Sequence, residues 1–150
     1  MLWESRAILA YLVNQYAPGH SVYPAEAKER ALVDRALYFE TGSLYPLQAA
    51  AFYGQFFGKP IDEEKKKAYC DKLEILNTTI GEQKYVVGGG TKTLADLSLM
   101  ATLVAAKAVG ADLSPYANVT RWLKDLRSEV AYDDQNQEMF EGLKACASRK

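Results

Sequence analysis

Residues 94–108 are the stretch that most constrains the fold, because most of their positions are apolar and recur at helical spacing. The apolar side chains are Leu97, Met100, Ala101, Val104 and Ala108, and the stretch ends just before Gly110. A helix that is apolar on nearly all sides has to be enclosed by other elements. The stretch therefore predicts a buried central helix within a larger helical domain.

Thr93 and Asp96 stand at the start of this stretch with the spacing of a capping box. The Thr93 side chain can accept a hydrogen bond from the Asp96 N–H, and the Asp96 carboxylate can accept one from the Thr93 N–H. The first N–H groups of a buried helix have no water to bond with. We therefore interpret Thr93 and Asp96 as a structural capping box, with no role in chemistry.

The rest of the chain also has helical periodicity, interrupted by glycine and proline. Helices are predicted at about residues 2–16, 25–57, 62–80, 114–130 and 133–147. Gly42 and Pro46 predict a kink in the second of these, near residues 42–46. The predicted fold class is all-α, with about five helices after the first one.

Charge and composition exclude several classes of function. The net charge is −1, so there is no basic footprint for a nucleic acid, and no apolar run approaches the roughly 18 residues of a membrane span. Cys70 and Cys146, together with the single histidine, His20, have no spacing typical of metal sites or of a disulfide framework. We expect no metal, no nucleic-acid or membrane partner, and a reducing, cytoplasmic location.

The first turn of the N-terminal helix carries three side chains suited to a small zwitterion. Ser5 can donate to a carboxylate, Arg6 can pair with one, and Glu4 can accept from an ammonium group. Free N–H groups at a helix start also favour an anion. The γ-glutamyl end of a peptide fits this set, and a helix cap with two solvated charges is the alternative interpretation.

The second predicted helix is rich in aromatic residues around its expected kink. One face, at spacings of 3, 4 and 4, carries Tyr45, Gln48, Phe52 and Phe56. Core packing explains such a stripe, because aromatic side chains dominate cores. Core packing is therefore the default interpretation, and a cleft opened by the kink is the alternative.

Several runs together resemble the glutathione transferase family, and most closely its insect delta and epsilon classes. They are Trp3-Glu4-Ser5-Arg6-Ala7-Ile8, Tyr11-Leu12, Tyr23-Pro24, Tyr116-Ala117-Asn118-Val119-Thr120-Arg121-Trp122, and Tyr132-Asp133-Asp134 with Asn136. The resemblance implies that residues 1–24 are the last helix and linker of a thioredoxin-like N-terminal domain. Residues 25–150 would be the all-helical C-terminal domain, and most of the first domain would be missing from this chain.

The resemblance also implies conjugation of glutathione to hydrophobic electrophiles, a detoxification reaction, by a homodimer. Glutathione would be a co-substrate, and no other cofactor is implied. The implied glutathione-binding residues are Glu4, Ser5 and Arg6. The implied electrophile pocket consists of Tyr45, Gln48, Phe52, Tyr53, Phe57 and Phe140. The serine or tyrosine that activates the thiol in this family has no counterpart here, so no catalytic residue is predicted.

Two other functions remain open from the sequence. The chain could be a non-catalytic helical module for interaction or dimerisation that resembles a transferase domain. It could also be catalytic by another route, although no nucleophile–base pair is recognisable.

Overall fold

The computed structural model describes residues 1–130, 138, 141–142 and 145–146. All regular elements in this part are helices, which confirms the predicted all-α fold class. The α-helices are α1 (Ser5–Tyr16), α2 (Ala27–Phe39), α3 (Tyr45–Phe52), α4 (Glu63–Ile80), α5 (Leu94–Ala108) and α6 (Ala117–Glu129). No helix in these ranges has the length and hydropathy of a membrane span. The helix predicted at residues 133–147 falls mostly outside the described residues.

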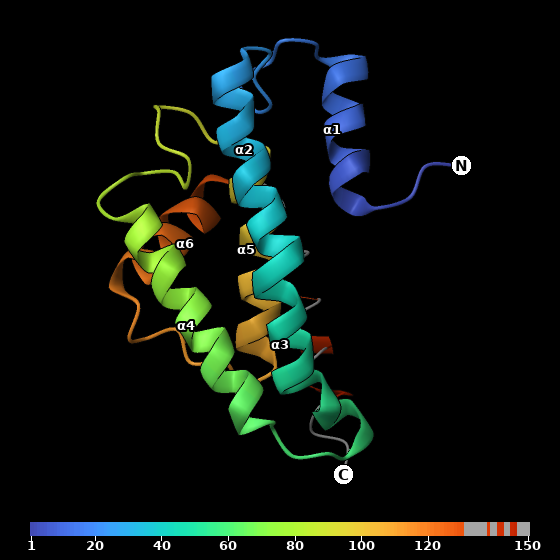
Figure 1. Ribbon diagram of the computed structural model, residues 1–150, viewed down its shortest axis with the longest axis vertical. Coiled ribbons are helices and arrows are strands. Elements are labelled where there is room, and N and C mark those ends of the chain that lie inside the picture. The colour runs from blue at the N-terminus through green and yellow to red at the C-terminus, as the bar shows by residue number, and fades with distance from the viewer. Residues whose placement is uncertain (131–137, 139–140, 143–144, 147–150) are drawn as a thin grey trace.

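Helix α5 is the centre of the bundle, as its apolar sequence predicts. Eleven of its fifteen residues are buried, and it packs against α1, α2, α3 and α6. In Figure 1, α5 lies behind the long rod that α2 and α3 make, and α4 runs alongside that rod. The other helices therefore have one face on α5 or on each other and one face in water.

The capping box at the start of α5 is confirmed, and its acid does more than cap. Both hydrogen bonds of the box are present between Thr93 and Asp96. The buried Asp96 carboxylate also accepts from the backbone N–H of Val86 at 2.8 Å and from the indole N–H of Trp122 at 3.0 Å. One carboxylate therefore joins the start of α5, the loop before it and the core face of α6.

The aromatic-rich helix is interrupted by a π-helical turn, η1 (Glu40–Leu44), at the predicted kink. Pro46 lacks an N–H and follows this turn, at the start of α3. The Tyr45 N–H bonds to the carbonyl of Glu40, five residues back, which is the hydrogen bond of a π-helix. After α3 the chain tightens into a 3₁₀-helix, η2 (Tyr53–Phe57), which ends at Gly58 with a left-handed backbone.

Helix α1 stands beside the first turns of α2, at one end of the bundle (Figure 1). None of its residues is fully buried, and those that pack on the core are Leu9, Ala10 and Val13. The guanidinium of Arg30 lies 4.4 Å from the ring of Tyr23 and donates to the Asn14 side chain, so it connects α1, the linker and α2. The division into residues 1–24 and 25–150 stays a prediction.

Candidate functional site

The predicted zwitterion site lies at the exposed start of α1. Glu4 precedes the helix with φ at +71°, the only non-glycine residue with positive φ among those described. Such a conformation is strained and is found preferentially at functional sites. No side chain caps the helix, so its first N–H groups remain open to an anion.

The guanidinium of Arg6 turns inward to a fully buried carboxylate, that of Glu40 in η1. Its Nε donates to Glu40 Oε2 at 2.7 Å, and a second N–H donates to Oε1. The hydroxyls of Ser98 and Thr102 on α5 donate to the same carboxylate at 3.1 and 2.5 Å. Both oxygens of the buried acid are therefore bonded, as a buried charge requires.

This network determines how Ser5 is presented. A further N–H of Arg6 donates to the Ser5 hydroxyl oxygen at 2.7 Å. Because that oxygen is an acceptor there, the hydroxyl proton is left to donate to another group. Ser5 therefore offers a hydrogen-bond donor at an exposed helix start, and Glu4 offers an acceptor. The hydrogen bond from Arg6 orients the Ser5 side chain.

Sequence reasoning missed Glu40, Ser98 and Thr102. A signal was present, since Ser98 and Thr102 are four residues apart on a mostly apolar helix and therefore share one side of it. Their partner could not be read from the sequence, because Glu40 lies about sixty residues away along the chain.

The structure brings some of the predicted pocket residues together. The rings of Tyr45 and Tyr53 meet edge to face with centroids 6.2 Å apart, and Tyr53 lies 5.6 Å from Phe56. Beneath them, the Gln48 amide N–H donates to the Tyr53 hydroxyl at 3.1 Å. Burial raises the pKa of Tyr53, and Tyr45 adds to this shift.

Phe52 and Phe57, two other predicted pocket residues, have different surroundings. Phe52 is buried in the core, edge to face with Tyr69. Phe57 is 82% exposed at the end of η2. Phe140 lies outside the described residues.

The two predicted half-sites meet at η1. Glu40, which binds Arg6, opens this turn, and Tyr45, the first aromatic residue of the cluster, follows it directly. The Tyr45 N–H bonds to the Glu40 carbonyl. The turn therefore links the start of α1 to the aromatic cluster through one continuous piece of backbone.

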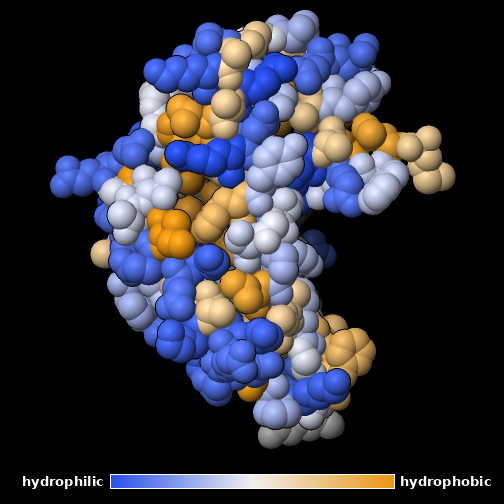
Figure 2. Space-filling model, in the orientation of Figure 1, coloured by the Kyte–Doolittle hydropathy of each residue, from blue (hydrophilic) through white to orange (hydrophobic). Residues whose placement is uncertain are grey.

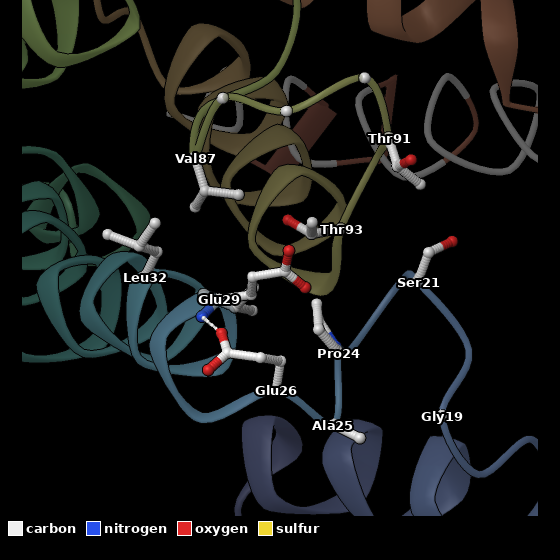
Figure 3. Close-up of a pocket in the computed structure, with 14 residues that line it drawn as sticks. Gly19, Ser21, Pro24, Ala25, Glu26, Glu29, Leu32, Val87, Thr91 and Thr93 are labelled. Atoms are coloured by element: carbon white, nitrogen blue, oxygen red, sulfur yellow. Dashed lines mark hydrogen bonds between the residues drawn. The ribbon is translucent and has the colours of Figure 1, made fainter.

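A cavity of about 640 Å³ lies elsewhere, between the α1–α2 connection and the loop at residues 87–93 (Figure 3). Its walls include Leu32, Val87, Thr93 and the carboxylates of Glu26 and Glu29. Glu26 caps α2 by accepting from the Glu29 N–H, and this bond is the main cause of its lowered pKa. Of the predicted site and cap residues within the described part of the chain, Thr93 is the one that lines this cavity.

No group of three or more His, Cys, Asp or Glu residues in the described part of the chain could hold a metal ion. The candidate site consists of a donor–acceptor set at a helix start, the buried ion pair of Arg6 with Glu40, and an aromatic cluster beyond η1. Such an arrangement can bind a small charged group next to an apolar one.

Comparison with solved structures finds relatives of this chain, although no protein-family model matches it. A delta-class glutathione transferase of Nilaparvata lugens is 38% identical with a TM-score of 0.91, over 97% of this chain and 69% of that one. A Bombyx mori glutathione transferase is 31% identical (TM-score 0.89), over 97% of this chain and 68% of that one. An epsilon-class enzyme of Musca domestica is 29% identical (TM-score 0.85), with the same coverage.

Proposed function

This chain belongs to the glutathione transferase family, near its insect delta and epsilon classes, and we propose that it takes part in conjugating glutathione to hydrophobic electrophiles. It spans 69% of the length of the delta-class relative. We assign its residues to binding and positioning and none of them to activation of the thiol. In this role it would act in detoxification in the cytoplasm.

The observation that carries the proposal is the donor geometry at Ser5. The Ser5 hydroxyl accepts a hydrogen bond from Arg6, which is itself held by the buried Glu40. The Ser5 hydroxyl can therefore donate a hydrogen bond to the γ-glutamyl carboxylate. The open N–H groups of α1 add to this attraction. Glu4 can accept from the γ-glutamyl ammonium group.

The electrophile would lie on the aromatic cluster. Tyr45 is 43% exposed and Tyr53 is half-buried, so both rings can contact an apolar ligand. Phe57 and Phe140 are proposed as further contacts, and the buried Gln48 and Phe52 would support the pocket from behind. A pocket of this kind discriminates weakly between apolar substrates.

Titration of the chain with glutathione, followed by NMR of the backbone amides, tests the proposal. We expect the amides at the start of α1 to shift with glutathione and not with the dipeptide cysteinylglycine, which lacks the γ-glutamyl group. Ser5→Ala is expected to weaken binding about tenfold, because a hydrogen bond to a charged group is lost. Ser114→Ala, at an exposed serine elsewhere, is the matched control. Equal shifts with both ligands, or unchanged binding by Ser5→Ala, would contradict the proposal.

We also propose that the chain forms a homodimer through the face of α2 and α4. Figure 2 shows hydrophobic side chains at the surface between these helices. Ile75 is 49% exposed there and lines, together with Phe39 and Leu76, a small cavity of about 170 Å³. Exposed apolar surface of this kind favours association.

Sedimentation equilibrium checks the dimer. Ile75→Lys is expected to give a monomer, because it places a charge in the proposed interface. Leu12→Lys, at a similarly exposed position on α1, is the control. Dissociation by Leu12→Lys but not by Ile75→Lys would assign the interface to α1 and refute this face.

A further inference from the structure

The amide of Gln48 is a buried polar group that core packing does not explain. The side chain is fully buried in α3, its N–H donates to the Tyr53 hydroxyl at 3.1 Å, and its oxygen has no partner within the described part of the chain. Leaving a buried amide oxygen unpaired is costly and uncommon. An apolar residue of similar size would fill the same space without that cost.

The bond from Gln48 determines the direction in which Tyr53 can donate. A phenol oxygen that accepts from an amide keeps its own proton for a different acceptor. The Tyr53 ring is half-buried and packs against Tyr45, which is exposed. The proton is therefore available on the Tyr45 side, to the Tyr45 hydroxyl or to a ligand lying on these two rings.

We propose that Gln48 is a positioning residue that makes the Tyr53 hydroxyl a hydrogen-bond donor to the electrophile. The aromatic cluster would then favour electrophiles that carry an acceptor oxygen, such as a carbonyl, next to the reacting carbons. This inference rests on the proposed function, because it needs the electrophile to lie on Tyr45 and Tyr53.

A hydrogen-bond donor at this place would assist the addition of a thiolate to a conjugated carbonyl compound. When a thiolate adds to a carbon–carbon double bond conjugated with a carbonyl, the sulfur–carbon bond forms and the π-electron pair moves onto the carbonyl oxygen. A donor at that oxygen stabilises the developing negative charge. The enolate then takes a proton from water to give the neutral adduct. Tyr53 keeps its own proton throughout, and burial raises its pKa in the direction that keeps it protonated.

Binding of two nearly isosteric probes to the whole chain tests this inference. Acetophenone carries a carbonyl where α-methylstyrene carries a C=CH2 group, and ligand-observed NMR gives the dissociation constant of each. The measured quantity is the ratio of the two constants, which cancels their shared apolar contacts. Tyr53→Phe is expected to lower the preference for acetophenone roughly fivefold, the effect of one neutral hydrogen bond.

Two apolar variants of Gln48 separate the positioning role from simple packing, because both keep the core filled and neither can donate to Tyr53. We expect Gln48→Leu to lower the preference at least twofold. Gln48→Met, which removes the donor and keeps an apolar core, is expected to lower it at least twofold. Gln15→Leu, at an exposed glutamine on α1, is the control and should change nothing.

The outcomes are distinguishable. An unchanged ratio in both Gln48 variants, with a lowered ratio in Tyr53→Phe, would overturn the role of Gln48 and leave the proposed pocket intact. An unchanged ratio in Tyr53→Phe would overturn the donor itself. Failure of both probes to bind the unmodified chain would refute the electrophile pocket, and this inference with it.

Discussion

Asp96→Ala is expected to lower the free energy of unfolding by about 3–5 kcal/mol, since the carboxylate is the shared acceptor of several buried donors. The N–H of Thr93 donates to it at 2.9 Å, in addition to Val86 and Trp122. Alanine leaves these donors buried and unpaired, at about 1–3 kcal/mol each, less any local relaxation. For a chain of this size the melting temperature should fall by roughly 10 °C.

Thermal and urea unfolding followed by circular dichroism measures the effect. Asp125→Ala is the matched control, because Asp125 is exposed and its ion pair with Arg121 is 3.9 Å long. That surface pair contributes less than about 1 kcal/mol. If the two alanine variants were equally stable, the role given to Asp96 would be wrong.

Arg6→Ala should destabilise the chain by a similar amount, about 3–5 kcal/mol, for a different reason. The Arg6 side chain is 27% exposed, whereas Glu40 is fully buried. Removing Arg6 leaves the Glu40 carboxylate with only the hydroxyls of Ser98 and Thr102. An ionised group that has lost its counter-charge in the core is costly to keep there.

A double-mutant cycle identifies this cause. Adding Glu40→Gln to Arg6→Ala removes the buried charge and keeps an acceptor for the two hydroxyls, so it should restore about 2 kcal/mol. Lys124→Ala, at an exposed cation on α6, should be nearly neutral. Purely additive effects in the cycle would mean that Arg6 and Glu40 contribute independently.

What the sequence predicted correctly depends on short-range patterns. The capping box is recognisable because both members lie within four residues, and the central helix because its apolar positions recur at helical spacing within a short stretch. The other donors to Asp96 could not be predicted, since Trp122 is 26 positions away. The bonds of Glu40 to Ser98 and Thr102 could not be predicted for the same reason, because they join residues far apart in the sequence.

The aromatic stripe shows where a periodic argument fails. A constant 3.6-residue period places Tyr45, Phe52 and Phe56 on one face. The chain instead changes from α-helix to 3₁₀-helix at Tyr53, so later residues turn by a larger angle. Phe52 lies before this change and is buried in the core, whereas Tyr53 and Phe56 lie after it, with their ring centroids 5.6 Å apart.

The π turn at η1 also has a consequence for how such a chain can change by insertion and deletion. A π turn holds one more residue than the α-helical turn it replaces, so it shifts the phase of everything after it by about 100°. Glu40 lies before this shift and Tyr45 after it. Loss of a single codon within the turn, for instance that of the unhindered Gly42, would rotate the aromatic cluster about the rod axis. The ion pair of Arg6 with Glu40 lies before the shift, whereas the buried Gln48 and Phe52 lie after it, so the length of this turn determines which face of α3 enters the core.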